Sequence, residues 1–552
     1  MQIDDWGVDR KYRNPSVVSK PGLYRDNSMV FRLQLIRKGI SSRVNFVDKT
    51  ESNATLCRVS GKPPDMQKFC LSLGVAALVS ISSLSHAEQP VIDLPQIGNP
   101  ADLAISPAEE IRIGRQVASE LYYYNYVVED PELTEYLASV GWRLAANGGE
   151  SPPSFEFLLI ADPRINAFAL PGAYIGVNAG LLLAAANESE LASVMAHEEA
   201  HVTQRHAARS ANEGEVATIA TWLAVLAAII AGSANPNVVI GALSIGQGIN
   251  YNRQVSYTRA NEYEADRIGI RTLAASGFDP NAMAGFFAKL EQQTRLYGNQ
   301  LPEILLTHPI NTTRVAEAQE RAAQYPHRDI VDSVDFSLMH ARIRTFIADS
   351  ANDSKGYFTR EIEVGNDTPE NRYGLALSLE QLEQHENAMV ALAPLVKEYP
   401  KQVTINLLQA QILTGLGKTN EALDLYAKTL SVVPRYAPAI FAYSEALIAA
   451  NKPDEARQLL LTHEQALGKR NDTYRLLSSA ARASGRTAEA QYQQALYLSG
   501  RGDLVSALQQ LNAGLRVASI TAQDRARLSA KRQELLETIP RDELRKLQRQ
   551  PG

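Results

Sequence analysis

Residues 187–201 read NESELASVMAHEEAH, and this stretch decides the interpretation of the first half of the chain. Its first residue and the Glu three positions later form a helix-capping box, and apolar residues then recur at helical spacing. His197 and His201 are four residues apart, so a helix projects both imidazoles from one face. Two such imidazoles can bind one tetrahedral ion, and Glu198 is placed to take a proton from a water at the metal. The stretch predicts a metal-hydrolase helix.

Two histidines do not complete a metal site, so a further ligand must come from another part of the chain. His206 lies five residues beyond His201, about 140° around a continuous helix, which points it away from the metal. Its position therefore predicts a solvated helix residue.

The segment 261–269, NEYEADRIG, is the better source of a third ligand. Glu262 and Asp266 share a helix face, so one carboxylate can bind metal while the other orients a ligand histidine. Glu264 lies between them and points elsewhere on a helix.

The second half of the chain carries an internal repeat. Alanines recur every 34 residues at Ala388, Ala422, Ala456 and Ala490, and Pro400 and Pro434 are separated by the same interval. A helix–turn–helix unit of this length, with a small residue where its helices cross, resembles the tetratricopeptide repeat. Such arrays bind peptides or partner proteins on their concave face.

The segment 66–87 reads as a secretory signal peptide. It has a short basic start, an apolar stretch and small residues before a cleavage point after Ala87. Residues 1–65 precede it as a non-native or disordered extension. Both cysteines, Cys57 and Cys70, come before the cleavage point, so the exported chain contains no thiol. Export without cysteine suits a periplasm.

Net charge and hydropathy limit the classes of partner that can be expected. The formal net charge of −6 provides no basic field, so no nucleic-acid partner is expected. The uncharged segment 216–232 would be roughly 25 Å long as a helix, which is marginal for spanning a bilayer. It either lies buried in the protease domain or makes peripheral contact with a membrane surface.

Three motifs together resemble the M48 metalloproteases: the helical HExxH at 197–201, the ExxAD at 262–266, and the strand segment NAFALPG at 166–172. The order of signal peptide, M48 domain and repeat array is similar to periplasmic members of this family in Gram-negative bacteria. The resemblance covers residues 66–552.

Carried over to this sequence, the resemblance implies one zinc ion per chain, held by His197, His201 and Glu262. It implies that Glu198 is the general base. Asp266 matches an Asp of the family that orients a ligand or donates a proton.

The resemblance also assigns residues around the cleft. Asn166 precedes a strand, 167–178, that would pair with an extended substrate, and Arg314 is a second substrate-binding candidate. His308, in Thr307-His308-Pro309, can face the metal in two opposed roles. It either stabilises the oxyanion or occupies the open zinc position and keeps the enzyme latent.

The expected fold is an α+β zincin-like metalloprotease domain, mostly helical with a small sheet, followed by an all-α tetratricopeptide solenoid. The expected divisions are a 1–65 extension, an 66–87 signal peptide, an 88–335 protease domain, a 336–360 linker and a 361–552 repeat domain.

Two functions follow. The first is an exported zinc endopeptidase whose repeats select protein substrates; by family resemblance these are misassembled outer-membrane β-barrel proteins, with the barrel assembly machinery as partner. The alternative is a non-enzymatic periplasmic assembly factor with a structural zinc. Against it, HExxH carries a Glu that no structural site requires.

Overall fold

The computed structural model describes residues 105–149, 152–211, 259–297, 304–326 and 330–539. The predictions for the extension, the signal peptide and the apolar segment 216–232 concern residues outside these ranges. Among the described residues, no helix combines the length and apolar character needed to cross a membrane.

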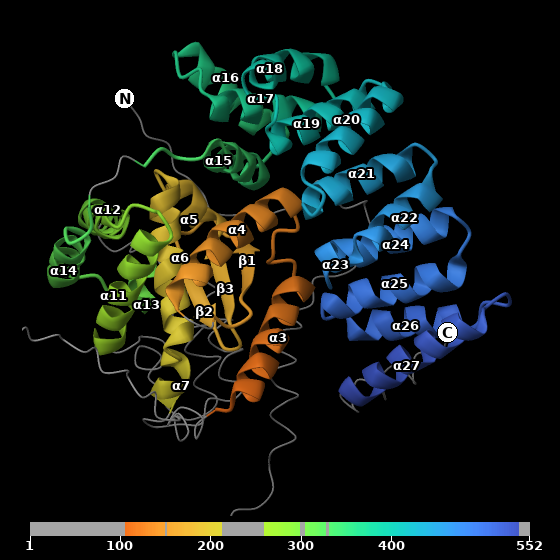
Figure 1. Cartoon of the computed structure of the whole chain (residues 1–552), viewed down its shortest axis with the longest axis horizontal. Coiled ribbons are helices and arrows are strands. Elements are labelled where there is room, and N and C mark those ends of the chain that lie inside the picture. Colours follow the sequence, from red (N-terminus) through yellow and green to blue (C-terminus); the bar gives the residue numbers. More distant parts are fainter. Residues whose placement is uncertain (1–104, 150–151, 212–258, 298–303, 327–329, 540–552) are drawn as a thin grey trace, which may run out of the picture. The chain divides into compact units, whose positions relative to one another are not determined.

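The first half is mostly helical with one small sheet, as predicted (Figure 1). Its helices are α3 (Pro107–Tyr123), α4 (Pro131–Gly148), α5 (Ala179–Ala184), α6 (Glu188–Thr203), α7 (His206–Ala211), α11 (Arg259–Ala275), α12 (Asn281–Tyr297), α13 (Ile304–Thr307) and α14 (Thr312–Ala322). The metal-hydrolase helix predicted from the sequence is α6.

The sheet has three strands in the order β1-β3-β2: β1 (Glu156–Ile160), β2 (Ala167–Leu170) and β3 (Tyr174–Asn178). The central strand β3 pairs parallel with β1 and antiparallel with β2. In the described part of the chain, no strand pairs with the outer side of β2. The backbone groups on that side are therefore open to a further strand.

The predicted single strand 167–178 is wrong, because it is a hairpin of β2 and β3. Gly172 and Ala173 adopt left-handed φ values of 76° and 67° and reverse the chain. A Cβ on Gly172 would lie 2.7 Å from Cα of Ile111, so this position excludes a side chain. Of the two strands of this hairpin, β2 lies at an edge of the sheet among the described residues, whereas β3 is paired on both sides.

Each face of the sheet packs on a different helix. Ala167, Ile175 and Val177 share one apolar cluster with Leu191 and Met195 of α6. The residues that alternate with them pack on the other face against α3; they are Phe168, Leu170 and Tyr174. The sheet thereby holds α6 in a fixed position.

The predicted linker 336–360 is mostly helical, since it lies almost entirely within α15 (Val334–Ile347) and α16 (Ala351–Glu363). Ser350 caps α16 by accepting a hydrogen bond from the Asp353 backbone N–H. Ser354 is buried, and its hydroxyl accepts a hydrogen bond from the Ser378 hydroxyl. The polar residues around Ser350 therefore act as a helix-start signal.

The repeat array follows as successive helices (Figure 1). They are α17 (Pro369–Gln381), α18 (His385–Glu398), α19 (Val403–Gly415), α20 (Thr419–Val432), α21 (Ala437–Ala449), α22 (Pro453–Thr462), α23 (Glu464–Leu467), α24 (Asn471–Ala483), α25 (Thr487–Gly500), α26 (Leu504–Leu515) and α27 (Ala522–Thr538).

The 34-residue repeat is confirmed in the packing. The four alanines of the repeat are all buried, one each in α18, α20, α22 and α25. The turns carry the same period, because Glu383, Gly417, Asn451 and Gly485 all have left-handed φ values. A small residue at the crossing and a left-handed residue at the turn therefore recur together.

Candidate metal centre

The helix α6 carries two buried imidazoles on one face. The Asn187 side chain caps it by accepting from the Glu190 backbone N–H at 2.8 Å, as the capping box predicted. His197 and His201 are both buried, and their Nε2 atoms lie 3.0 Å apart. Two ring nitrogens at this distance can both contact one metal ion.

The helix α11 brings a carboxylate to the same space. Glu262 Oε2 lies 3.5 Å from His197 Nε2, and its Oε1 lies 3.4 Å from His201 Nε2. The two helices pack closely here, since a Cβ on Gly269 would lie 2.8 Å from Cε of Met283 and 3.4 Å from the backbone N of His197. The sequence placed Glu262 correctly on the face that meets α6.

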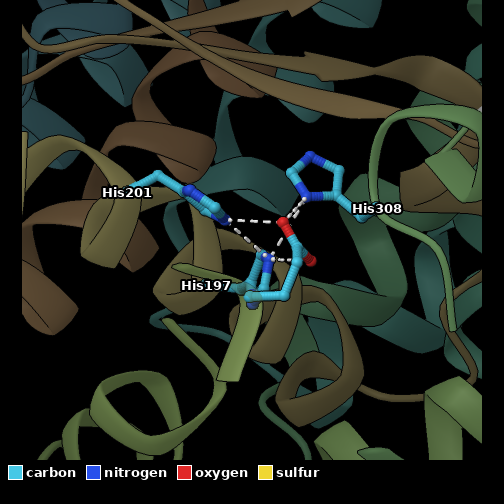
Figure 2. A group of neighbouring side chains, drawn as sticks. His197, His201 and His308 are labelled. Atoms are coloured by element: carbon cyan, nitrogen blue, oxygen red, sulfur yellow. Dashed lines mark hydrogen bonds and ion pairs between the residues drawn. The ribbon is translucent and has the colours of Figure 1, made fainter. Parts of the chain in front are cut away.

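His308 joins this group from the residue after α13. Its Nδ1 lies 3.0 Å from Glu262 Oε1 and 3.4 Å from His197 Nε2. Figure 2 shows the imidazoles of His197, His201 and His308 turned toward one another. One donor atom from each imidazole and from Glu262 lies within 4.8 Å of the others, and all four residues are buried.

These four residues fit a zinc ion. Imidazole nitrogen and carboxylate oxygen are donors that zinc accepts in tetrahedral sites. Glu198 lies next to these four residues. Both its carboxylate oxygens are buried and accept no hydrogen bond from the described residues, and Oε1 lies 3.5 Å from His308 Nε2. A carboxylate buried in this way needs a nearby positive charge or a water.

The ionisation states reflect this crowding. Burial opposes charge on Glu262, but His308 and His197 outweigh it and hold its pKa well below the usual value. Burial also opposes charge on His197, yet Asp266 and Glu262 raise its pKa to about 10. Burial and the charge on His197 lower the pKa of His201. The carboxylates therefore favour a positive charge at this position.

Asp266 lies behind His197 rather than in the cluster. Its Oδ1 is 2.9 Å from His197 Nδ1, the ring nitrogen on the far side from Glu262. Burial opposes its charge, but His197 and Arg314 together lower its pKa. Of the two roles expected for Asp266, this contact matches the orientation of a ligand histidine.

Arg314, expected to bind substrate, contacts the carboxylates of the site in this structure. Its guanidinium is buried and donates to both Asp266 oxygens at 2.7 Å and to the Pro309 carbonyl at 2.9 Å. Its Nη1 also lies 2.8 Å from Glu262 Oε2. These partners occupy the side chain, so it holds the carboxylates in place.

The prediction that His206 is solvated is wrong. The helix α6 ends at Thr203, Arg205 turns the chain at φ 51°, and His206 begins α7. The rotation of a continuous helix no longer applies, and His206 is fully buried with Nδ1 2.9 Å from His201 Nδ1. The left-handed Arg205 carries no signal in the sequence that would have indicated this.

Asn166 does not join the metal cluster. It lies just before β2, where its carbonyl accepts from the Asn178 backbone N–H at 3.0 Å. Both asparagine side chains are buried, and neither amide has a hydrogen-bond partner within the described ranges of the chain. Asn178 was not predicted, because its pairing with Asn166 follows only from the hairpin register.

Glu199 occupies the opposite face of α6 from the ligand histidines. It faces a cavity of about 140 Å³ lined mainly by apolar groups, among them Phe155, Ala196 and Ile268. Its Oε1 has no hydrogen-bond partner in the part of the chain that the structure describes, and burial raises the pKa of this carboxyl to about 9. The residue is therefore a source of instability rather than part of the metal centre.

Known proteins match the chain in both halves. The model of peptidase family M48 matches residues 131–322, from α4 to α14, and a tetratricopeptide repeat model matches residues 413–477. A Vibrio cholerae protein named "Putative beta-barrel assembly-enhancing protease" is 38% identical over 340 residues, which are 61% of this chain and 69% of the relative. The chain belongs to peptidase family M48.

Other relatives of this M48 peptidase are also named as proteases. The "Beta-barrel assembly-enhancing protease" of Escherichia coli is 35% identical over 356 residues, 63% of the chain and 73% of the relative. The "Mitochondrial metalloendopeptidase OMA1" of Schizosaccharomyces pombe is 29% identical over 187 residues, 34% of the chain and 52% of the relative. The M48 peptidase is accordingly a zinc metalloendopeptidase with tetratricopeptide repeats.

Replacing Glu199 by Leu is expected to stabilise the M48 peptidase. The folded state binds a proton at Glu199 up to pH about 9, whereas the unfolded chain releases it near the ordinary value of 4.5. Stability therefore falls as pH rises between these values, by at most about 1.4 kcal/mol per pH unit. Thermal unfolding followed by circular dichroism should show a higher midpoint for Glu199→Leu, with a larger gain at pH 8.5 than at pH 6.

Glu199→Gln is the matched variant, because it retains the shape and polarity of the side chain but cannot ionise. It should show a weaker pH dependence of the midpoint than the wild type. A Glu199→Leu midpoint below that of the wild type at both pH values would contradict the assignment.

Proposed function

We propose that His197, His201 and Glu262 hold the catalytic zinc of this peptidase. The observation that supports this most directly is the convergence of their donor atoms, which are all buried and within 4.8 Å of one another. When bound, zinc supplies a Lewis acid that polarises the scissile carbonyl and makes water more acidic. The protein holds the three ligands in place through α6 and α11.

Glu198 is the proposed general base. It follows His197 on α6, its carboxylate is buried, and neither oxygen accepts a hydrogen bond from any described residue. Both oxygens are therefore available to take the proton of the attacking water and to transfer it to the leaving amine.

The edge strand β2 is the proposed support for substrate. Its outer backbone groups are unpaired among the described residues, so an extended peptide can add to the sheet there. Asn166 lies where this strand begins, and its side-chain amide has both a donor and an acceptor without partners. A peptide bond of the substrate can satisfy both.

His308 is the proposed plug of the resting enzyme. Of its two expected roles, this one accounts better for a ring nitrogen 3.0 Å from Glu262 and 3.4 Å from His197. Zinc hydrolases need three protein ligands and one open position. A fourth protein donor fills that position and keeps the enzyme latent until His308 moves away.

Export and the substrate class are part of the same proposal. The signal-peptide pattern at 66–87 supports secretion to a periplasm, and two relatives are named as β-barrel assembly-enhancing proteases. We therefore infer that the substrates are misassembled outer-membrane β-barrel proteins. The repeats would bind these substrates or the barrel assembly machinery.

Glu198→Gln is expected to lower peptide hydrolysis by about 100- to 10,000-fold, because it removes the general base. Zinc content, measured on the purified protein, should stay at one per chain. The assay uses an unfolded outer-membrane β-barrel protein as substrate, with its folded form for comparison.

The matched control is Glu199→Gln, the same change at the next residue on the opposite face of the helix. It should retain wild-type hydrolysis. Cleavage by Glu198→Gln at the wild-type rate would refute the catalytic assignment, and equal cleavage of folded and unfolded barrels would refute the substrate class.

His308→Ala is expected to raise hydrolysis several-fold, because it opens the position that the imidazole occupies. Initial rates at equal zinc content are the measurement. His463→Ala, a histidine of the repeat region that bonds the Leu459 carbonyl, serves as control. A fall in rate on His308→Ala would instead support stabilisation of the oxyanion.

Cleavage of the signal peptide predicts that the mature chain begins at Glu88. Mass spectrometry of the protein recovered from the periplasmic fraction of a Gram-negative host should find this N-terminus. Retention of residues 66–87 in the mature protein would contradict secretion with cleavage.

A further inference from the structure

A second buried histidine supports the metal-ligand histidine His201. His206 is the first residue of α7, and its side chain is fully buried. Its Nδ1 lies 2.9 Å from Nδ1 of His201, the ring nitrogen that faces away from Glu262. His206 is therefore behind the ligand and outside the cluster of four donor groups.

The contacts continue from His206 to the surface. Its Nε2 lies 3.0 Å from Glu264 Oε2 on α11, and both terminal nitrogens of Arg209 donate to that same oxygen at 3.1 Å. Glu264 is partly exposed and Arg209 more so. A continuous line of polar groups runs from His201 through His206 to this ion pair.

The other ligand histidine on α6 has a related support. Nδ1 of His197 lies 2.9 Å from Asp266, which Arg314 holds with two hydrogen bonds at 2.7 Å. Each ligand imidazole is thus backed by a carboxylate that an arginine clamps. For His201 an additional imidazole is interposed, because its carboxylate, Glu264, lies nearer the surface.

The hydrogen-bond directions follow from the ring chemistry. Nε2 of His201 faces Glu262 and the His197 ring, so its lone pair must be free to bind metal. The proton of a neutral His201 then resides on Nδ1 and is donated to Nδ1 of His206. His206 must carry its own proton on Nε2, where it donates to Glu264.

We propose that His206 is a positioning residue that fixes the tautomer and ring orientation of His201, with Glu264 and Arg209 fixing His206 in turn. This inference rests on the zinc site proposed above. Groups that hold a ligand histidine in this way typically change metal affinity by about 10- to 100-fold. His206 therefore contributes to zinc affinity without touching the metal.

The test is the zinc dissociation constant of the full-length protein, measured by competition with a chromophoric chelator. His206→Ala should weaken zinc binding by about 10- to 100-fold. His340→Ala is the matched control, because His340 also lies between a carboxylate, Glu370 at 2.7 Å, and a second polar group, the Leu183 carbonyl. It should leave the zinc affinity unchanged.

Two further readouts separate positioning from a general loss of structure. Added imidazole should restore part of the zinc affinity of His206→Ala by refilling the vacated space. The visible spectrum of the Co²⁺-loaded protein should change in His206→Ala and remain unchanged in His340→Ala, since only the former alters a ligand's orientation.

Glu264→Ala keeps the experiment decisive if His206→Ala does not fold, because Glu264 is partly exposed. It should weaken zinc binding in the same direction by a smaller factor. Zinc affinity within twofold of wild type in whichever of these variants folds would overturn the inference. Absence of zinc binding by the wild type would overturn the proposed metal site itself.

Discussion

The contact on which the site depends is that of Glu262 with the imidazoles around it. One carboxylate on α11 lies within 3.5 Å of His197, His201 and His308, which come from two other parts of the chain. These groups are polar and buried, so each costs free energy unless the others or a metal ion compensate it. The packing of α6 against α11 brings His197, His201 and Glu262 close enough for this compensation.

The surrounding groups reduce that cost and restrict the geometry. Arg314 is buried and contacts both Glu262 and Asp266, so it balances negative charge without occupying the space between the imidazoles. Asp266 and His206 each contact the far ring nitrogen of a ligand histidine. Asp266 and His206 therefore lie where they can orient His197 and His201, the proposed zinc ligands.

In the proposed function, chemistry and recognition are carried by different elements. The edge strand β2 would offer backbone groups to an extended peptide, and the tetratricopeptide helices would offer a repeated surface. The apolar core does not end between them, because Phe336 of α15 and Phe358 of α16 belong to the same cluster as Met195 of α6. The segment expected to be a linker thus packs into this cluster and joins the first repeat helices to the protease core.

The sequence by itself determined the features that depend on local periodicity. A four-residue spacing on one helix predicts that His197 and His201 share a face, and a 34-residue period predicts the helix pairs of the repeat region. The resemblance of the motifs to M48 peptidases added Glu262, which the structure places beside them. Only the tertiary structure decided where the chain turns: a left-handed Arg205 returns His206 to His201, and the Gly172 turn divides one expected strand into two. It also decided that Arg314 is occupied by carboxylates. Such contacts join residues far apart in the chain, and local spacing contains no information about them.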